Sequence, residues 1–275
     1  MKRLLLTTFL CVSTSILFAQ DNAQPVTRKQ DSSQTKKPDI LILGYGEGSP
    51  VLNFRKMRVT FKQPVLPYPN FSFGIIVSRL DLGLTTLLDH SSFALRPQND
   101  FLTYHSWKST NAGFDVFQIG ERFSDNFKIY LSAGFDWTNL RLSQNVTILP
   151  NESSLSYQPS NVNLSKNRFT SSYLRLPLSF DFRSKANAKG RRFHFVFGPD
   201  AGFLITASVK QVSSEDGTQK TNNTYNYTNF RYGAFTRIGY GKWGVFAKYY
   251  FNNTFSNSPE QDGLKNFSYG ISLGF

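Results

Sequence analysis

Cysteine is almost absent from this chain of 275 residues. Cys11 is the single one, and it lies in an apolar stretch close to the N-terminus. A chain without a pair of cysteines cannot be a disulfide scaffold, and it has no cysteine-ligated metal site. Packing, hydrogen bonds and ion pairs must therefore hold the fold together.

Long hydrophobic runs are missing as well. Beyond the N-terminal stretch, no segment of the sequence approaches the ~20 consecutive apolar residues of a membrane-spanning helix. Charged residues make up 18% of the chain, which is below the ~25% of an ordinary soluble domain. Aromatic residues, in contrast, make up 16%, with 27 Phe and 13 Tyr. In an exported protein this composition favours a transmembrane β-barrel, and it fits a secreted or periplasmic β-sandwich less well.

Export is predicted from the start of the chain. Lys2 and Arg3 precede an apolar run from Leu4 to Phe18, and Ala19 takes the last position before an expected cleavage site. This is the pattern of a secretory signal peptide. Together with the barrel composition, it predicts a protein of the outer membrane of a Gram-negative bacterium.

The sequence after the signal peptide of residues 1–19 divides into three parts. Residues 20–38 are polar and predict a flexible linker. Residues 39–70 predict a periplasmic N-terminal segment with a short hairpin as one option, and three prolines near its end favour an extended approach to the next domain. Residues 71–275 are predicted to form the barrel.

The C-terminal part alternates between large apolar residues and small or polar ones, which predicts strands with two different faces. We expect eight strands, with ten as the alternative count: 71–88, 101–122, 127–148, 168–183, 191–211, 227–240, 243–252 and 267–275. Long connections (89–100, 149–167, 212–226 and 253–266) alternate with short ones (123–126, 184–190 and 241–242). That alternation is typical of outer-membrane barrels, so the sequence predicts an all-β fold, an antiparallel up-and-down barrel.

The two faces of these strands predict which side meets lipid. In residues 191–211, Phe193 begins the apolar face, and the opposite face runs from His194 to Lys210. We expect the faces rich in Phe, Leu and Ile to meet lipid and the polar faces to line the lumen. The last strand ends in Phe275, which is expected to face lipid and resembles the terminal signal read by the barrel-assembly machinery.

Charged residues on the predicted inner face form the candidate site. They are Lys128, Asp136, Arg175, Asp181, Arg183, Asp200, Arg231, Arg237 and Lys248. Such a lumen either binds or passes a polar solute, or it is filled by a network of paired charges. An eight-stranded barrel has an interior just wide enough for side chains, which favours the network.

The sequence predicts no catalytic, cofactor-binding or metal-binding residues. His105 and Ser106 lie in a stretch that faintly resembles the His-x-Ser-Asn motif of lipid A deacylase barrels, but the spacing differs. The three histidines lack metal-ligand spacing. In a cytosolic protein the net charge of +13 would suit nucleic acid. In an exported protein it predicts contacts with outer-membrane lipids and lipopolysaccharide, and no nucleic-acid partner.

Three stretches carry a resemblance to a known family. "YLRLPLSFDF" (173–182), "GPDAGFLITA" (198–207) and "FRYGAFTRIGYGKWGVFAKYYFNNTF" (230–255) resemble the PorT-like outer-membrane β-barrel family. The resemblance implies a barrel without a motif that carries chemistry, and an envelope or secretion protein as a candidate partner. We therefore expect a non-enzymatic barrel of structural or interaction type, with a role accessory to secretion or envelope assembly as the narrower hypothesis. The alternatives are a small lipid-modifying enzyme of the outer leaflet and a narrow solute channel.

Overall fold

A computed structural model of the protein describes residues 70–75 and 79–275. The predicted signal peptide (1–19), the linker (20–38) and nearly all of the predicted N-terminal segment lie outside the described residues. Among those that are described, no helix is long and apolar enough to cross a membrane.

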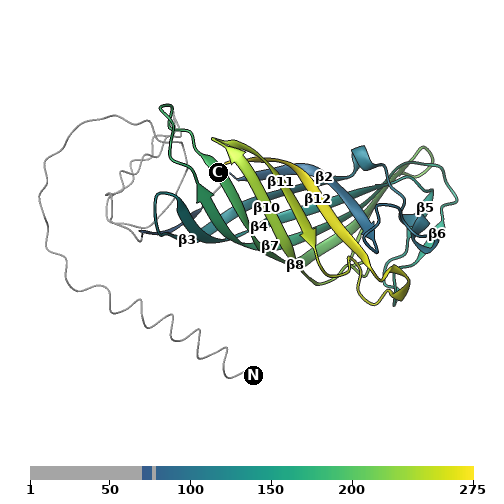
Figure 1. Ribbon diagram of the computed structural model, residues 1–275. Helices are drawn as coiled ribbons and strands as arrows, with labels where there is room; N and C mark the ends of the chain where they lie inside the picture. The colour runs from purple at the N-terminus through teal and green to yellow at the C-terminus, as the bar shows by residue number, and fades with distance from the viewer. Residues whose placement is uncertain (1–69, 76–78) are drawn as a thin grey trace, which may run out of the picture. The chain divides into compact units, whose positions relative to one another are not determined.

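Eight antiparallel strands close into a barrel (Figure 1). The first barrel strand has two segments, β1 (Asn70–Ile75) and β2 (Leu80–Asp89), which pair with opposite halves of β3. Each later strand pairs with the one before it, and β12 pairs back onto β2. The other strands are β3 (Thr110–Arg122), β4 (Phe127–Leu142), β7 (Leu164–Arg183), β8 (Phe193–Ser213), β10 (Phe230–Tyr240), β11 (Trp243–Tyr250) and β12 (Leu264–Leu273). The predicted all-β up-and-down barrel is confirmed, and so is the count of eight.

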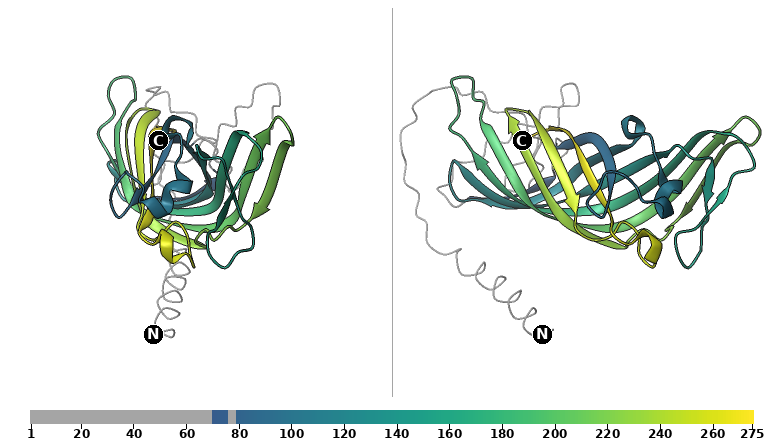
Figure 2. Two further views of the ribbon diagram at one scale, coloured as in Figure 1. Left: turned by 90° about the vertical axis from the view of Figure 1, so that its right-hand side faces the viewer. Right: turned by 45° about the vertical axis from the view of Figure 1, so that its right-hand side comes forward.

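The two ends of the barrel differ. We call the end with the connections 123–126, 184–192 and 241–242 the turn end, and the opposite end the loop end. The loop end carries the hairpin of β5 (Val146–Ile148) and β6 (Tyr157–Pro159), and β9 (Gly217–Asn223), which extends the sheet along β8. It also carries three short 3-10 helices: η1 (Pro97–Leu102), η2 (Ser106–Lys108) and η3 (Pro259–Gln261). Figure 2 shows these elements around the mouth of the barrel.

Two predicted strands are shorter than the sequence suggested. The sequence predicts residues 101–109 as part of the second strand, but they lie in η1, η2 and the short stretches that connect these helices to each other and to β3. Phe101 and Leu102 are both buried in an apolar core instead of alternating between two faces. The third strand was expected to reach residue 148, but it ends at Leu142 and the chain turns into the β5–β6 hairpin.

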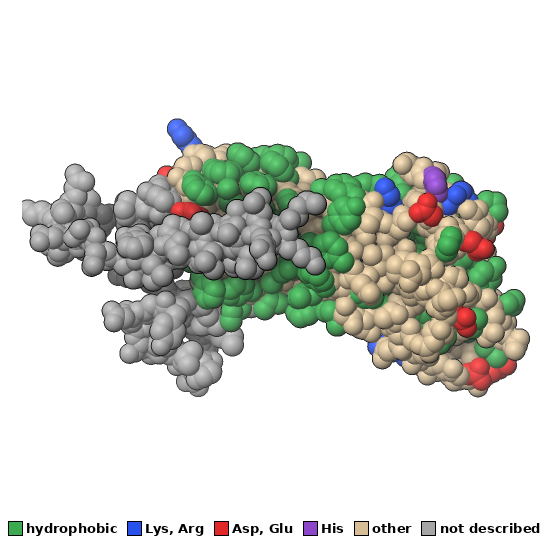
Figure 3. Space-filling view, turned by 90° about the horizontal axis from the view of Figure 1, so that it is seen from below, with side chains coloured by type: hydrophobic (Ala, Val, Ile, Leu, Met, Phe, Trp, Pro, Cys, Tyr) green, Lys and Arg blue, Asp and Glu red, His purple; other side chains and the backbone are tan. Residues whose placement is uncertain are grey.

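Large apolar side chains cover the outside of the barrel toward the turn end, and polar side chains dominate the loop end (Figure 3). The exposed residues include Phe71, Phe73, Phe182, Phe193, Phe195, Phe197, Phe203, Tyr232, Ile238, Tyr240, Trp243, Val245, Tyr269 and Ile271. A soluble protein would bury rings of this kind, whereas a barrel in a bilayer turns them toward lipid. This surface is the membrane-facing band of the barrel.

The interior changes character along the barrel, which the sequence did not predict. The polar faces were expected to line the whole lumen, but the loop end encloses an apolar core. Its buried members are Leu87, Phe101, Leu102, Leu140, Leu142, Val146, Ile148, Leu155, Phe169, Ala207, Val209, Tyr225, Tyr227, Phe255 and Leu264. Above the membrane band the outer face meets water, so the apolar residues there gain by turning inward, as in a soluble domain.

A bulge in β8 reverses the faces of that strand. The register against β7 shifts between Ser172 and Tyr173, so that Ile205 is an extra residue without a partner. Beyond it, Ala207 and Val209 enter the apolar core. The prediction that Lys210 lines the lumen is therefore wrong, because the bulge places this side chain on the outer face.

The C-terminal residue is also placed differently from the prediction. β12 ends at Leu273, and Gly274 has a φ of 81°, a left-handed conformation that glycine adopts without strain. Phe275 was expected to face lipid, but its ring packs at the turn end of the interior against a cluster of Tyr130, Val196 and Phe235. A Cβ at Gly239 would lie 2.5 Å from that ring, so the glycine makes room for it.

Cysteine labelling on whole cells tests which end of the barrel lies outside the cell. We expect the loop end to be extracellular and the turn end to be periplasmic. Long loops of outer-membrane barrels are extracellular and short turns are periplasmic. Ser153→Cys, in an exposed part of the loop end, should react with a membrane-impermeant maleimide, and Lys185→Cys should react only after cell lysis. The unsubstituted protein is the control, since its one cysteine lies in the predicted signal peptide. Labelling of Lys185→Cys alone on intact cells would show the reverse orientation.

Candidate functional site in the barrel interior

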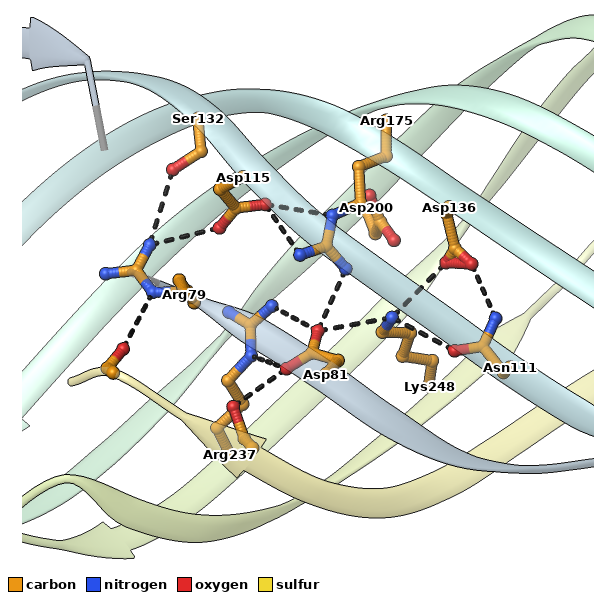
Figure 4. Close-up of polar contacts among 12 residues, drawn as sticks. Arg79, Asp81, Asn111, Asp115, Ser132, Asp136, Arg175, Asp200, Arg237 and Lys248 are labelled. Carbon is orange, nitrogen blue, oxygen red and sulfur yellow. Dashed lines mark hydrogen bonds and ion pairs between the residues drawn. The ribbon is translucent and has the colours of Figure 1, made fainter. Parts of the chain in front are cut away.

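A network of ion pairs fills the interior near the membrane band (Figure 4). Asp81, near the start of β2, is its most connected residue and is fully buried. One of its oxygens, Oδ2, lies 2.9 Å from Arg175, 2.8 Å from Arg237 and 3.2 Å from Lys248. The hydroxyl of Ser272 donates to the other oxygen at 2.7 Å. Three cations thus surround one carboxylate, a charge density that a buried site supports only when further carboxylates balance it.

Two more buried carboxylates provide that balance. Asp115 on β3 accepts from Arg175 through Nε at 2.9 Å and Nη2 at 2.6 Å, and it pairs with Arg79 at 3.1 Å. Asp136 on β4 lies 3.2 Å from Lys248 and accepts a hydrogen bond from the Asn111 amide. Arg175 and Lys248 therefore each join two carboxylates, which makes the pairs one continuous network.

Arg231 extends the network toward the apolar core. Its Nη2 lies 3.4 Å from Asp136 Oδ2. Its guanidinium carbon lies 3.8 Å from the centre of the Tyr173 ring and 4.1 Å from that of Tyr250, so the cation is held between two aromatic faces. The Tyr250 hydroxyl also lies 3.1 Å from a carboxylate oxygen of Asp200. Two aromatic rings therefore form much of the immediate surroundings of this buried cation.

Every strand of the barrel contributes to this network. The first three barrel strands supply Asp81, Asp115 and Asp136, whereas the main cations come from β7, β10 and β11. β8 adds Asp200 and β12 adds Ser272. The carboxylates Asp81, Asp115 and Asp136 thus meet cations from β7, β10 and β11 across the lumen, and their attraction ties strands that are not neighbours in the sheet.

The structure brings together most of the nine residues that the sequence singled out. Asp136, Arg175, Arg231, Arg237 and Lys248 belong to the network, with Asp200 beside them. Asp181 and Arg183 lie apart, at the turn end, where Asp181 pairs with Arg183 at 2.6 Å and with His194 at 3.4 Å. Lys128 is half-buried near them, with its amine 5.1 Å from the centre of the Tyr130 ring.

Sequence reasoning missed Asp81, Asp115 and Arg79. The strand from residue 71 was read as one irregular strand, whereas it has two segments, and Asp115 lies directly before a register shift in β3. A signal was present, since Asp81 lies between Leu80 and Leu82, and Asp115 has Phe114 and Val116 on either side. Such an acid is costly in a membrane strand unless it has buried partners.

Little free space remains around the network. A Cβ at Gly113 would lie 2.7 Å from a nitrogen of Arg175, so this glycine provides the room for the guanidinium. Beside Arg231, Tyr173 and Tyr250 lies a cavity of about 20 Å³. That is room for about one water molecule, so the cavity is too small for a solute.

A second cluster anchors the loops over the mouth of the barrel. Asp89, the last residue of β2, accepts from the backbone N–H of Arg96 at 2.9 Å, from the Arg96 guanidinium at 2.7 Å and from the Asn99 amide at 2.7 Å. Gln261 of η3 in turn donates to Asn99. Burial raises the pKa of Asp89, but the hydrogen bonds from Arg96 and Asn99 outweigh it and lower the pKa to about 2.

The residues that suggested an enzyme do not form a catalytic arrangement. His105 and Ser106 are both exposed at η2. Within residues 79–275 neither side chain hydrogen-bonds to a carboxylate, whereas a nucleophile and its base need such an orienting partner. Nor do three or more His, Asp or Glu side chains come together as a metal site in this part of the chain.

A closed eight-stranded sheet with an apolar exterior and a filled, charged interior defines an outer-membrane β-barrel protein. The chain belongs to the outer membrane protein beta-barrel domain family, whose model matches residues 71–258. No curated protein matches the sequence. Among solved structures, Ail, the attachment invasion locus protein of Yersinia pestis, is similar at 9% identity with a TM-score of 0.30, covering 72% of this chain and 95% of Ail.

Replacing Arg175 tests whether the network stabilises the barrel. Arg175→Met leaves Asp81 and Asp115 each short of a cation, and breaking a buried pair from one side typically costs about 3–5 kcal/mol. Arg168→Met is the matched control, because Arg168 lies on the same strand and faces outward. Urea unfolding in lipid vesicles should show a large decrease in the free energy of unfolding for Arg175→Met and almost none for Arg168→Met. Equal losses would mean that the network adds nothing specific.

The Asp89 cluster predicts a pH dependence. The pKa of Asp89 is lowered to about 2 in the folded protein, whereas an unfolded Asp has a pKa of about 3.9. The stabilising effect of the Asp89 carboxylate is therefore complete above pH ~3.9 and is lost as the pH falls toward 2. Asp89→Asn should therefore make the 90–109 loop more sensitive to protease at pH 7, and the difference from the unsubstituted protein should shrink near pH 2.5. Asp100 is an exposed acid in η1, so Asp100→Asn should change neither the protease sensitivity of the loop at pH 7 nor its dependence on pH. A difference for Asp89→Asn that stays constant with pH would refute the assignment.

Proposed function

We propose that this outer-membrane protein is a non-conducting, non-enzymatic barrel that presents a rigid interaction surface outside the cell. The observation that carries the proposal is the apolar core inside the loop end. An apolar core inside the lumen would block conduction, so it does not suit a pore. A platform that must hold its loops in one conformation does need it.

Two aromatic side chains mark the candidate contact surface. Trp107 is 86% exposed and Phe93 is 68% exposed, and both lie in the connection between β2 and β3 at the loop end. Exposed aromatic residues are enriched where proteins bind one another. Because Asp89 and Arg96 fix the backbone near Phe93, the surface is ordered before a partner arrives, which lowers the entropy lost on binding.

The filled interior supports the absence of transport. The ion-pair network crosses the lumen, and the cavity beside Arg231 holds about one water molecule. An accessory role in secretion or envelope assembly, as the PorT-like resemblance implies, is the narrower form of this proposal. In that form the partner is an envelope or secretion protein that meets the loop end.

Photo-crosslinking tests the interaction surface. A photoreactive phenylalanine analogue at Trp107 or Phe93 should give the same discrete protein adduct in living cells, because both positions lie on the proposed contact surface. The same analogue at Lys185, an exposed position at the turn end, should not give it. An adduct shared by all three positions, or none at the loop end, would count against the proposal.

Two further measurements address the alternatives. In planar bilayers the purified barrel should show no conductance steps under conditions in which a general porin does. Lipid A from a strain lacking the protein should have the same mass spectrum as lipid A from the parent strain. Regular conductance steps would favour the channel, and a change in lipid A acylation would favour the enzyme.

A further inference from the structure

Four cations lie directly opposite one another across four neighbouring strands at the loop end. Arg141 of β4 pairs in register with Arg168 of β7, Arg168 with Lys210 of β8, and Lys210 with Lys220 of β9. We call these four residues the basic row. Directly opposed residues share one face of a sheet, and in all four cases it is the outer face, since the neighbouring Phe169 and Val209 point into the apolar core.

This arrangement is unfavourable for the isolated protein. Like charges directly opposite one another destabilise a sheet, and here three such pairs follow in succession. None of the four cations takes part in an ion pair within residues 70–75 and 79–275; the Arg141 guanidinium instead donates to the Ser165 carbonyl at 2.7 Å. Lys166, two residues before Arg168 on the extracellular part of β7, has its pKa lowered mainly by Arg168. The described part of the fold therefore provides no counter-charge for the basic row.

The height of the row indicates where the counter-charge lies. On β4, Trp137 faces outward in the membrane band and Arg141 follows four residues later. With ~3.4 Å per residue and a tilt of ~40°, Arg141 lies about 10 Å above Trp137 along the membrane normal. Lys and Arg side chains are long enough to reach further down from there. An outer-leaflet glycolipid carries its phosphates on sugars that stand above the acyl chains, at a comparable height.

From these observations we propose that the basic row binds the phosphate groups of lipopolysaccharide in the outer leaflet. Its cations are spaced at strand distances of ~4.8 Å, so several can contact one bisphosphorylated sugar. A polar hollow of about 120 Å³ lies beside Arg141, and the exposed side chains of Gln144 and Asn163 in its lining offer amides to sugar hydroxyls. The site rests on the placement of the barrel in the membrane and is independent of the proposed protein partner.

Charge-neutral variants test the site. In one, Arg141, Arg168, Lys210 and Lys220 are all replaced by Gln; in the matched control, Lys185, Lys189, Arg191 and Lys242, exposed at the turn end, are replaced by Gln. Binding of bisphosphorylated lipid A to the purified barrel in neutral detergent is measured by the rise in melting temperature. The row variant should bind at least about tenfold more weakly than the unsubstituted protein, and the control variant should bind like it.

Further measurements distinguish the contribution of the phosphate groups to binding from that of the rest of the lipid. Enzymatically dephosphorylated lipid A should bind the unsubstituted protein as weakly as bisphosphorylated lipid A binds the row variant, and millimolar inorganic phosphate should not replace the lipid. Without lipid, the row variant should melt no lower than the unsubstituted protein, because its like charges are gone. Equal binding of both variants, or equal binding of both lipids, would overturn the proposal. Neither result depends on whether a protein partner is found at Trp107.

Discussion

The attraction between carboxylates on the first three barrel strands and cations on β7, β10 and β11 is the interaction on which the rest of the structure depends. A small barrel must fill its interior, and polar side chains buried there need partners on other strands. Arg175 spans Asp81 and Asp115, and Lys248 spans Asp81 and Asp136. These contacts link strands that are far apart in the chain, so they favour the closed barrel over an open sheet.

The membrane divides the molecule into two chemical regimes. Within the band, apolar rings face outward and charges face inward; above it, Phe169 and Val209 face inward and polar residues face outward. The bulge at Ile205 allows β8 to pass from one regime to the other without a break in its pairing with β7. The loop end therefore has the packing of a soluble domain built on a membrane barrel, which suits a surface that must keep its shape in water.

Much of this fold follows from the sequence, because alternation with a period of two reports the two faces of a strand directly. The limit of that reasoning lies at irregular positions. Alternation predicts the wrong face for Lys210, because a strict period of two cannot include the extra residue at Ile205. It also predicts the wrong position for Phe275, because Gly274 turns the chain after the last strand. The basic row was invisible for a related reason: Arg141 and Lys220 are far apart in sequence, and only strand register brings such residues together.

The central claim is that paired charges across the lumen hold the barrel closed, and a double-mutant cycle between Asp115 and Arg175 tests it most directly. Unfolding free energies in lipid vesicles would be measured for Asp115→Asn, Arg175→Gln and the double variant. The account predicts that the double variant loses less than the sum of the two single losses, with a coupling of roughly 1–3 kcal/mol. A coupling of zero would contradict it, since the two side chains would then contribute independently.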